Sequence, residues 1–258
     1  MKVLLLGDSI TQGLGSKRIN FADELNDLLG ENYEIINYAA SGTTIMYVYS
    51  NMDFVIDSGC EVVCILYGNV DAQLKPNRKG HIFKYLPHRF KINDGSMLLP
   101  RPFYSHKKYK KILQRIENGV RTFFRTLIYK IDGIEQWVPF NDFQSIYDEV
   151  VQTLIKNDRK IILCSTVFID NKLFPGTIEE YNKYNQFIKA TAEKNGGYYI
   201  DLYSTFENLV NVYGWDHCYN YDHFHPNAEG YRVMAKMLCD AIIEVGKMYN
   251  EEKSKRTN

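Results

Sequence analysis

Five short, mostly apolar stretches of the chain alternate with longer segments of helical periodicity. The apolar stretches predict strands, because runs of this length are typical of strands buried inside a parallel sheet. They cover residues 3–6, 33–38, 61–67, 160–167 and 197–201. The periodic segments predict helices over residues 18–30, 141–157, 177–194 and 228–249. Since parallel neighbours are joined by right-handed helical crossovers, the alternation favours one α/β domain with a five-stranded parallel sheet of order 2-1-3-4-5.

The connection after the third strand is much longer than such a sheet needs, so residues 72–140 form an insert. Within the insert, apolar residues recur at spacings of three and four and predict an amphipathic helix over about 105–131. The members of this apolar stripe are Tyr109, Ile112, Leu113, Ile116, Val120, Phe123, Phe124, Leu127 and Ile131. We expect the helix to pack on the body and to leave its basic face in solvent; a lid or docking surface is the alternative.

The net charge of the chain is zero, with 31 basic and 31 acidic residues, but the charge is segregated. Residues 75–130 hold fifteen Lys and Arg against only Asp94 and Glu117, a net charge of +13, so the rest of the chain carries −13. As a docking surface, the insert would take an acidic glycan, a diphosphate-linked lipid or the inner leaflet of a membrane. Nucleic acid is not an expected partner, because no recognised binding motif accompanies the charge.

We expect a single domain over residues 1–249, with 72–140 as a basic lid-like insert and 250–258 as a disordered polar tail. The five cysteines form no C-x-x-C pair and are expected to be reduced core thiols. The first strand begins at residue 2, so we expect no signal peptide, and no apolar run approaches the ~18–20 residues that cross a bilayer. A cytoplasmic protein, in one alternative peripheral to the inner membrane, is expected. No cofactor or metal site is predicted.

The first strand ends at Gly7-Asp8-Ser9, and helix-compatible sequence follows. A serine at the carboxyl end of a central strand, beside a helix N-terminus, lies near backbone N–H groups that can stabilise an oxyanion. Ser9 is therefore a candidate nucleophile, and a helix-capping serine is the alternative.

Near the other end of the chain, Asp222 precedes His225 by three residues, and Pro226 follows in what we expect to be the first turn of the last helix. This spacing lets the carboxylate orient one imidazole nitrogen while the other acts as a general base. His223 is another candidate base, and Asp216-His217 is a less favoured carboxylate–imidazole pair.

Gly7-Asp8-Ser9-Ile10-Thr11 and Asp222-His223-Phe224-His225-Pro226 resemble the first and last sequence blocks of the SGNH (GDSL-type) hydrolases. The resemblance implies a flavodoxin-like three-layer α/β/α sandwich and a triad of Ser9, His225 and Asp222. It also implies that Gly42, in the loop after the second strand, donates to the oxyanion together with the Ser9 N–H; a glycine that only makes the turn is the alternative.

The third block of that family, Gly-x-Asn-Asp, carries an asparagine that donates to the oxyanion. Aligned on Gly68 and Asp71, this position holds Val70, and Asn69 comes one residue early. Either the loop bulges to bring Asn69 inward, or the oxyanion hole depends on the N–H groups of Ser9 and Gly42 alone. Additional candidates for substrate contacts are Asp8, Asp71 and Thr43.

These features predict a serine-dependent acyl-ester hydrolase, an esterase or deacetylase. The basic insert also resembles those of SGNH-like proteins from bacterial surface-polysaccharide gene clusters, which makes an acylated carbohydrate or a related small ester the expected substrate. One alternative is an acyltransferase that passes the acyl group to a glycan with the same triad. Another is a non-catalytic binding protein of a membrane-associated polysaccharide assembly complex, an alternative motivated by Val70 and the basic insert.

Overall fold

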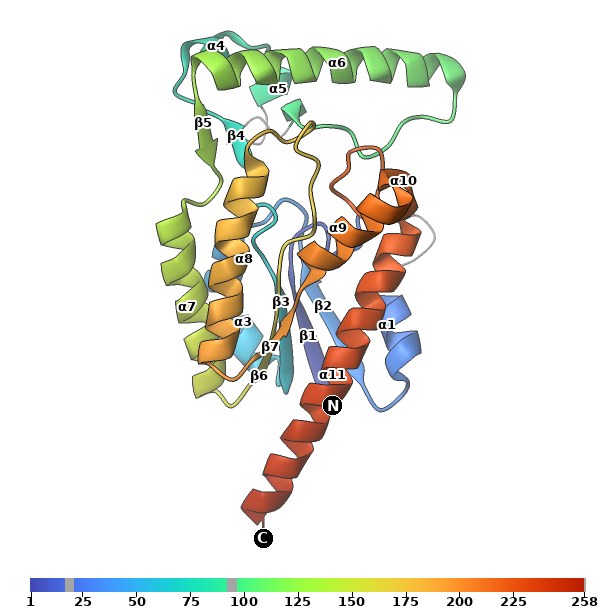
Figure 1. The fold of residues 1–258 in the computed structure, drawn as a ribbon. Coiled ribbons are helices and arrows are strands. Elements are labelled where there is room, and N and C mark those ends of the chain that lie inside the picture. The colour runs from blue at the N-terminus through green and yellow to red at the C-terminus, as the bar shows by residue number, and fades with distance from the viewer. Residues whose placement is uncertain (17–20, 92–96, 258) are drawn as a thin grey trace.

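The computed structural model describes residues 1–16, 21–91 and 97–257, and a five-stranded parallel sheet lies at its centre (Figure 1). In spatial order the strands are β2 (Glu34–Ala39), β1 (Lys2–Gly7), β3 (Val62–Leu66), β6 (Lys160–Cys164) and β7 (Tyr198–Ile200). Each neighbouring pair is parallel. Counted along the chain within this sheet, the order is 2-1-3-4-5, which confirms the prediction. The side chains of Val3 to Leu6 and Val62 to Ile65 are almost fully buried, as their unbroken apolar runs predict.

Helices cover both faces of the sheet and make a three-layer sandwich (Figure 1). On one face α1 (Phe21–Leu29) packs against α11 (Ala228–Thr257); on the other face lie α7 (Phe140–Lys156) and α8 (Thr177–Lys194). These four helices were predicted, although residues 18–20 of the first one lie outside the described residues. Outside the insert, four shorter helices of the described residues were not predicted: α2 (Ile45–Tyr49), α3 (Met52–Asp57), α9 (Leu202–Tyr213) and α10 (Trp215–Cys218).

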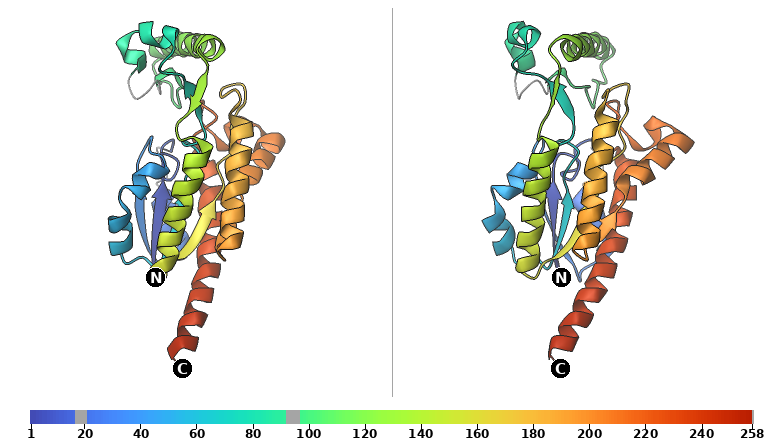
Figure 2. Two further views of the ribbon diagram at one scale, coloured as in Figure 1. Left: turned by 90° about the vertical axis from the view of Figure 1, so that its left-hand side faces the viewer. Right: turned by 60° about the vertical axis from the view of Figure 1, so that its left-hand side comes forward.

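The insert rises from the edge of the sheet at which the parallel strands end. Its base is a two-stranded antiparallel ribbon of β4 (Leu74–Pro76) and β5 (Ile134–Gln136). Above the ribbon, α6 (Lys108–Ile131) lies across the body, with α4 (His81–Tyr85) and α5 (His88–Lys91) beside it (Figures 1 and 2). The insert has a small apolar cluster of its own, formed by Phe83, Leu86, Phe90, Leu98 and Ile128.

The predicted orientation of α6 is wrong. Most of the apolar stripe faces solvent, and two arginines are buried beneath the helix instead: Arg121 is 5 % exposed and Arg125 is 2 % exposed. Glu117 explains part of the reversal, because it pairs with Arg121 at 2.8 Å and with Arg101 at 2.7 Å. The guanidinium of Arg125 lies over the ring of Phe174, 5.9 Å from its centroid. An ion pair within the helix, joined by Arg101, and the ring of Phe174 therefore allow the charged side of α6 to pack inward.

The C-terminal tail also differs from the prediction. The last helix was expected to end at residue 249 and to be followed by a disordered tail over residues 250–258, but α11 continues to Thr257. The sequence after Asn250 is rich in Glu, Lys and Arg, which have high helix propensity, so its polarity does not stop the helix. None of the helices within the described ranges is long and apolar enough to cross a membrane.

Candidate active site

Ser9 lies just beyond the carboxyl end of β1, in the middle of the sheet. Gly7 allows the side chain of Thr11 to pack directly against the end of β1, because a Cβ at position 7 would lie 2.0 Å from the Thr11 hydroxyl oxygen. Residues 8–15 form hydrogen-bonded turns, in which the Leu14 N–H donates to the Ser9 carbonyl at 2.9 Å. The serine therefore stands on a tight turn, and the expectation of a helix N-terminus directly beside it is wrong.

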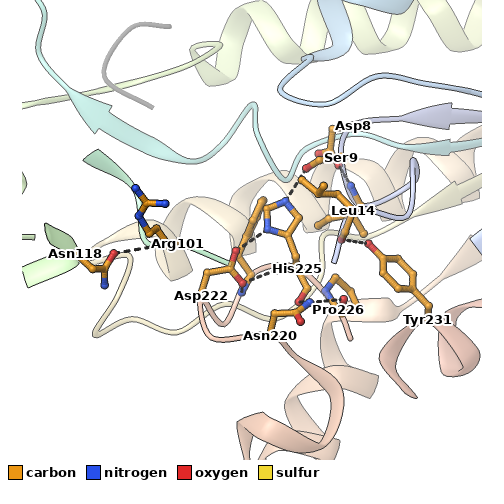
Figure 3. A network of polar contacts seen from close by, with 12 residues as sticks. Asp8, Ser9, Leu14, Arg101, Asn118, Asn220, Asp222, His225, Pro226 and Tyr231 are labelled. Carbon is orange, nitrogen blue, oxygen red and sulfur yellow. Dashed lines mark hydrogen bonds and ion pairs between the residues drawn. The ribbon is translucent and has the colours of Figure 1, made fainter. Parts of the chain in front are cut away.

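The structure brings Ser9, His225 and Asp222 together at this edge of the sheet (Figure 3). The Ser9 Oγ lies 2.9 Å from His225 Nε2, and His225 Nδ1 lies 2.6 Å from Asp222 Oδ2. Ser9 and Asp222 are buried, and the imidazole between them is partly exposed. This is the chain of hydrogen bonds through which a carboxylate orients a histidine to take a proton from a serine hydroxyl.

Local hydrogen bonds hold the histidine in place. Asp222 Oδ1 accepts from the N–H groups of Phe224 and His225, so this carboxylate shapes its own turn as well as orienting the ring. The Asn220 side chain donates to the carbonyls of His225 at 3.1 Å and Pro226 at 2.8 Å (Figure 3). Pro226 was predicted to lie in the first turn of the last helix, but it lies before the helix.

The helix begins at Ala228 instead, and the side chain of Asn227 caps it. Its Oδ1 accepts from the N–H groups of Glu229 and Gly230, at 2.9 and 3.1 Å. Asparagine is among the residues best suited to this position, because its side chain satisfies N–H groups that have no partner within the helix.

The other two candidate histidines, His223 and His217, contact residues other than Ser9. His223 Nδ1 bonds Asp170 Oδ2 at 2.7 Å, and its ring stacks on Trp215 with a centroid separation of 4.6 Å. His217 packs against the ring of Tyr213. Neither histidine lines the cavity that Ser9 faces, so of the three candidates the structure places only His225 against the serine.

A cavity of about 510 Å³ opens beside Ser9 and His225. Gly42 and Ser41 line it from the loop after β2, and Leu99, Pro100 and Trp137 line it from the insert. Gly42 has φ of +73° and stands at the third position of a turn closed by the Thr43 N–H and the Ala40 carbonyl. Glycine adopts this conformation without strain, which leaves the backbone open to the cavity.

Asn69 does not line the cavity. Its side chain is fully buried, and its Oδ1 accepts from the Val167 N–H at 2.9 Å. Val70 is the residue of this loop that lines the cavity. The alternative in which a bulge brings Asn69 inward is therefore wrong.

Gln73 is the residue that the sequence analysis missed. It lines the cavity, its side chain is 2 % exposed, and its Nε2 has no hydrogen-bond partner among the described residues. The Gln73 N–H donates to the Val70 carbonyl, so the chain turns back after Val70 and presents the residue three positions later. A buried amide without a partner is costly unless a ligand supplies one. The sequence signal was a glutamine between the apolar residues Ala72 and Leu74, shortly after Asp71.

The three candidates for substrate contacts lie behind the cavity. Asp8 and Asp71 are fully buried. Asp71 accepts from the N–H groups of Ile45 and Gly68, and Thr43 donates its hydroxyl to the Ala40 carbonyl. All three hold the loops that surround Ser9, and none of them lines the cavity.

Burial raises the pKa of Asp8 to about 6, against the opposing effect of a hydrogen bond from the Ile10 N–H. Burial likewise raises the pKa of Asp71 to about 7, although its hydrogen bonds from Ile45 and Gly68 lower it. Both carboxyls therefore bind protons more tightly in the folded chain than in the unfolded chain.

We expect the free energy of unfolding to decrease as the pH rises through about 6–7. The stabilising effect of protonation is complete below the unfolded pKa near 4 and is lost as each carboxyl ionises in the fold. For Asp8 alone, the shift corresponds to roughly 2–3 kcal/mol between pH 4 and 8. Urea titrations across this range should show the loss, and Asp8→Asn should show a smaller one. A pH dependence that is the same in the variant would contradict the assignment.

Comparisons with known proteins agree with this architecture. The model of the GDSL-like lipase/acylhydrolase family matches residues 5–233. An acetylxylan esterase from Geobacillus stearothermophilus aligns with a TM-score of 0.61 and 16 % identity, over 95 % of this chain and 94 % of that one. A second acetyl xylan esterase aligns with a TM-score of 0.60 and 20 % identity, over 94 % and 100 % of the two chains. No curated protein matches the sequence.

Several matching structures of the Geobacillus stearothermophilus enzyme are described as catalytic mutants, with a serine, a histidine or an aspartate replaced by alanine. At these identities the alignments establish the shared fold. The family model covers most of the chain, including Ser9 and the turn that carries Asp222 and His225. The chain therefore belongs to the GDSL-like lipase/acylhydrolase family and is a serine esterase or acylhydrolase.

Proposed function

We propose that this protein hydrolyses acyl esters, with Ser9 as nucleophile, His225 as general base and Asp222 as the residue that orients the imidazole. The observation that carries the proposal is the continuous hydrogen-bonded path from Ser9 Oγ through the histidine ring to Asp222, at the wall of a cavity. The test is loss of ester hydrolysis, and of labelling by a fluorophosphonate, when Ser9 is replaced.

The reaction proceeds in two displacements. Ser9 Oγ attacks the ester carbonyl carbon while its proton passes to His225 Nε2, and the carbonyl oxygen becomes an oxyanion. The tetrahedral intermediate expels the alcohol, which takes the proton from His225, and an acyl-serine remains. A water molecule then attacks the acyl carbon, gives its proton to His225, and the carboxylic acid is released as the proton returns to Ser9.

Stabilisation of the oxyanion requires hydrogen-bond donors that already face its position before the reaction begins. The backbone N–H groups of Ser9 and Gly42 are two candidates, as the sequence analysis proposed. For the third we propose Gln73 Nε2, in place of the asparagine that the family pattern has where this chain has Val70. Its burial, its place in the cavity wall and its missing partner support this assignment. The valine therefore does not argue for a non-catalytic protein.

Replacing Gln73 with methionine, which keeps the length of the side chain but cannot donate, should lower kcat by ~10²-fold and change KM little. Steady-state kinetics with p-nitrophenyl acetate would measure this. Gln73→Glu is the matched control for shape, and we expect it to be at least as impaired, because a carboxylate beside a developing oxyanion is repulsive. Wild-type kcat in the methionine variant would rule out the donor role.

For the substrate we propose an acylated carbohydrate or a related small ester. The structural neighbours named as acetylxylan esterases support this class. A second cavity of about 460 Å³ lies on the other side of the His225 turn and is lined by four Phe and Tyr rings and by the side-chain amides of Asn220 and Asn227. Its aromatic residues are Phe103, Tyr104, Tyr219 and Tyr221. Flat, amphipathic rings beside polar groups suit a sugar unit next to the acyl group.

Transfer of the acyl group to a glycan hydroxyl is the second candidate. The insert favours this candidate, because it contributes Leu99, Pro100 and Trp137 to the cavity wall, where apolar side chains can seat an acceptor sugar beside Ser9. Mass spectrometry of the products formed with and without an oligosaccharide acceptor separates the two reactions. Free acid under both conditions indicates a hydrolase, and an acylated oligosaccharide indicates a transferase.

We further propose that the protein works in the cytoplasm. Its cysteines, all five buried and none in a disulfide, support a reducing compartment. They are Cys60, Cys64, Cys164, Cys218 and Cys239. Subcellular fractionation of the host cell tests this.

A further inference from the structure

An apolar stripe runs along the outer side of α6, away from the body. Seven of its side chains are 40–64 % exposed: Tyr109, Ile112, Leu113, Ile116, Val120, Phe123 and Ile131. At about 100° per residue they fall on one side of the helix, whereas the buried residues Arg121, Arg125 and Ile128 fall on another. A contiguous apolar surface of this kind, on an element that is otherwise well anchored, indicates a binding surface.

Several interactions fix α6 in this orientation. The Tyr129 hydroxyl donates to the Leu74 carbonyl at 2.7 Å, and Ile128 is fully buried in the cluster of the insert. The Lys111 ammonium lies 5.8 Å from the ring centroid of Tyr221, the neighbour of Asp222. The stripe is therefore held outward by a helix whose underside reaches the catalytic turn.

The charge around the stripe identifies the kind of partner. Four of the seven basic residues of α6 are exposed, and at about 100° per residue Lys108, Arg115 and Lys130 fall along one edge of the stripe. The fourth, Lys110, falls on the side of Ile128 near the start of the helix. The single acidic residue of α6, Glu117, is paired with Arg101 and Arg121. Two copies of this chain docked through α6 would bring two strongly positive surfaces together, which is unfavourable. An anionic lipid surface offers hydrocarbon to the stripe and negative headgroups to the flanking cations.

We propose that α6 is a membrane-docking helix, which lies in the headgroup region of an anionic bilayer with its apolar stripe toward the acyl chains. The long basic side chains extend past the helix to the lipid phosphates. Because α6 lies across the end of the body at which the strands finish (Figures 1 and 2), docking would hold the catalytic cavity close to the membrane surface. The proposal does not depend on the acyl chemistry.

Sedimentation of the full chain with lipid vesicles tests the proposal. The protein should sediment with vesicles of phosphatidylcholine and phosphatidylglycerol in equal amounts, but not with phosphatidylcholine alone, and added salt should weaken the binding. Ile116→Gln with Phe123→Gln should lower the affinity by about tenfold or more, since two apolar side chains no longer enter the lipid. Lys108→Gln with Lys130→Gln should lower the affinity as well, because both cations lie at the edge of the stripe.

Leu28→Gln with Val212→Gln is the matched control, because both are exposed apolar residues on other helices. This variant, and Ser9→Ala, should sediment like the wild type, so a failure of docking is distinguishable from a failure of catalysis. Binding that is absent, indifferent to lipid charge or equally weakened in the control overturns the proposal. A wild-type dimer that the α6 variant makes monomeric, without vesicle binding, would instead assign the stripe to a second copy of the chain and would also overturn it.

Discussion

Ser9→Ala should lower kcat for ester hydrolysis by about 10⁴- to 10⁶-fold and abolish labelling by a fluorophosphonate. The loss is expected to be this large because no other hydroxyl is in hydrogen-bond contact with His225 Nε2, within the part of the chain that the structure describes. The measurements are steady-state kinetics with p-nitrophenyl acetate and fluorescence of the labelled protein in a gel.

Ser41→Ala is the matched control for this experiment. Ser41 also lines the cavity, but its hydroxyl donates to the Gln12 side chain and does not contact the imidazole. We expect its activity to stay within a few fold of the wild type and its labelling to be unchanged. If labelling survives in Ser9→Ala and is lost in Ser41→Ala, the nucleophile has been misassigned.

Asp222→Asn should be the second large effect, with kcat reduced by roughly 10³- to 10⁴-fold at neutral pH. An amide facing His225 Nδ1 favours the ring tautomer that carries its proton on Nε2, which cannot accept from Ser9. Because Asp222 Oδ1 also accepts two backbone N–H groups, the thermal unfolding of the variant must be measured alongside its kinetics.

The chain offers a close control in its second carboxylate–imidazole pair. Asp170 bonds His223 at 2.7 Å, nearly the same distance as in the catalytic pair, but that histidine stacks on Trp215 and does not line the cavity. Asp170→Asn should therefore leave kcat within a few fold of the wild type. A larger loss in Asp170→Asn than in Asp222→Asn would indicate that His223 is the base.

Much of the fold could be predicted from local patterns. Mostly apolar runs marked the five strands, and the runs of β1 and β3, which are buried on both faces, are unbroken. The helices α6, α7 and α8 were found from a period near 3.6. The three-residue strands β4 and β5 could not be found, because they are too short to show a period. The four-residue helix α10 is similarly short and was missed for the same reason.

Part of the candidate site could also be predicted from local patterns in the sequence. Asp222 and His225 are three residues apart, so their contact follows from the local chain, and Ser9 could be placed at a strand end. Gln73 could not be identified, because its direction depends on how the chain turns after Val70. The sequence left open whether the Asn69 side chain faces the cavity. In the fold it is buried instead, where it accepts a hydrogen bond from the Val167 N–H, 98 residues away.

Taken by itself, the sequence predicted the parallel sheet from its apolar runs and helical periodicity. Two short motifs, through their resemblance to a known family, indicated that family and the candidates Ser9, Asp222 and His225. Only the tertiary structure decided which side of α6 faces the body and which amide faces the cavity. The periodicity of a helix defines an apolar stripe but not the surface that covers it. Here Glu117 of the same helix pairs with Arg121 and with Arg101 of the preceding segment, and Phe174 lies beneath Arg125, so the apolar residues face outward.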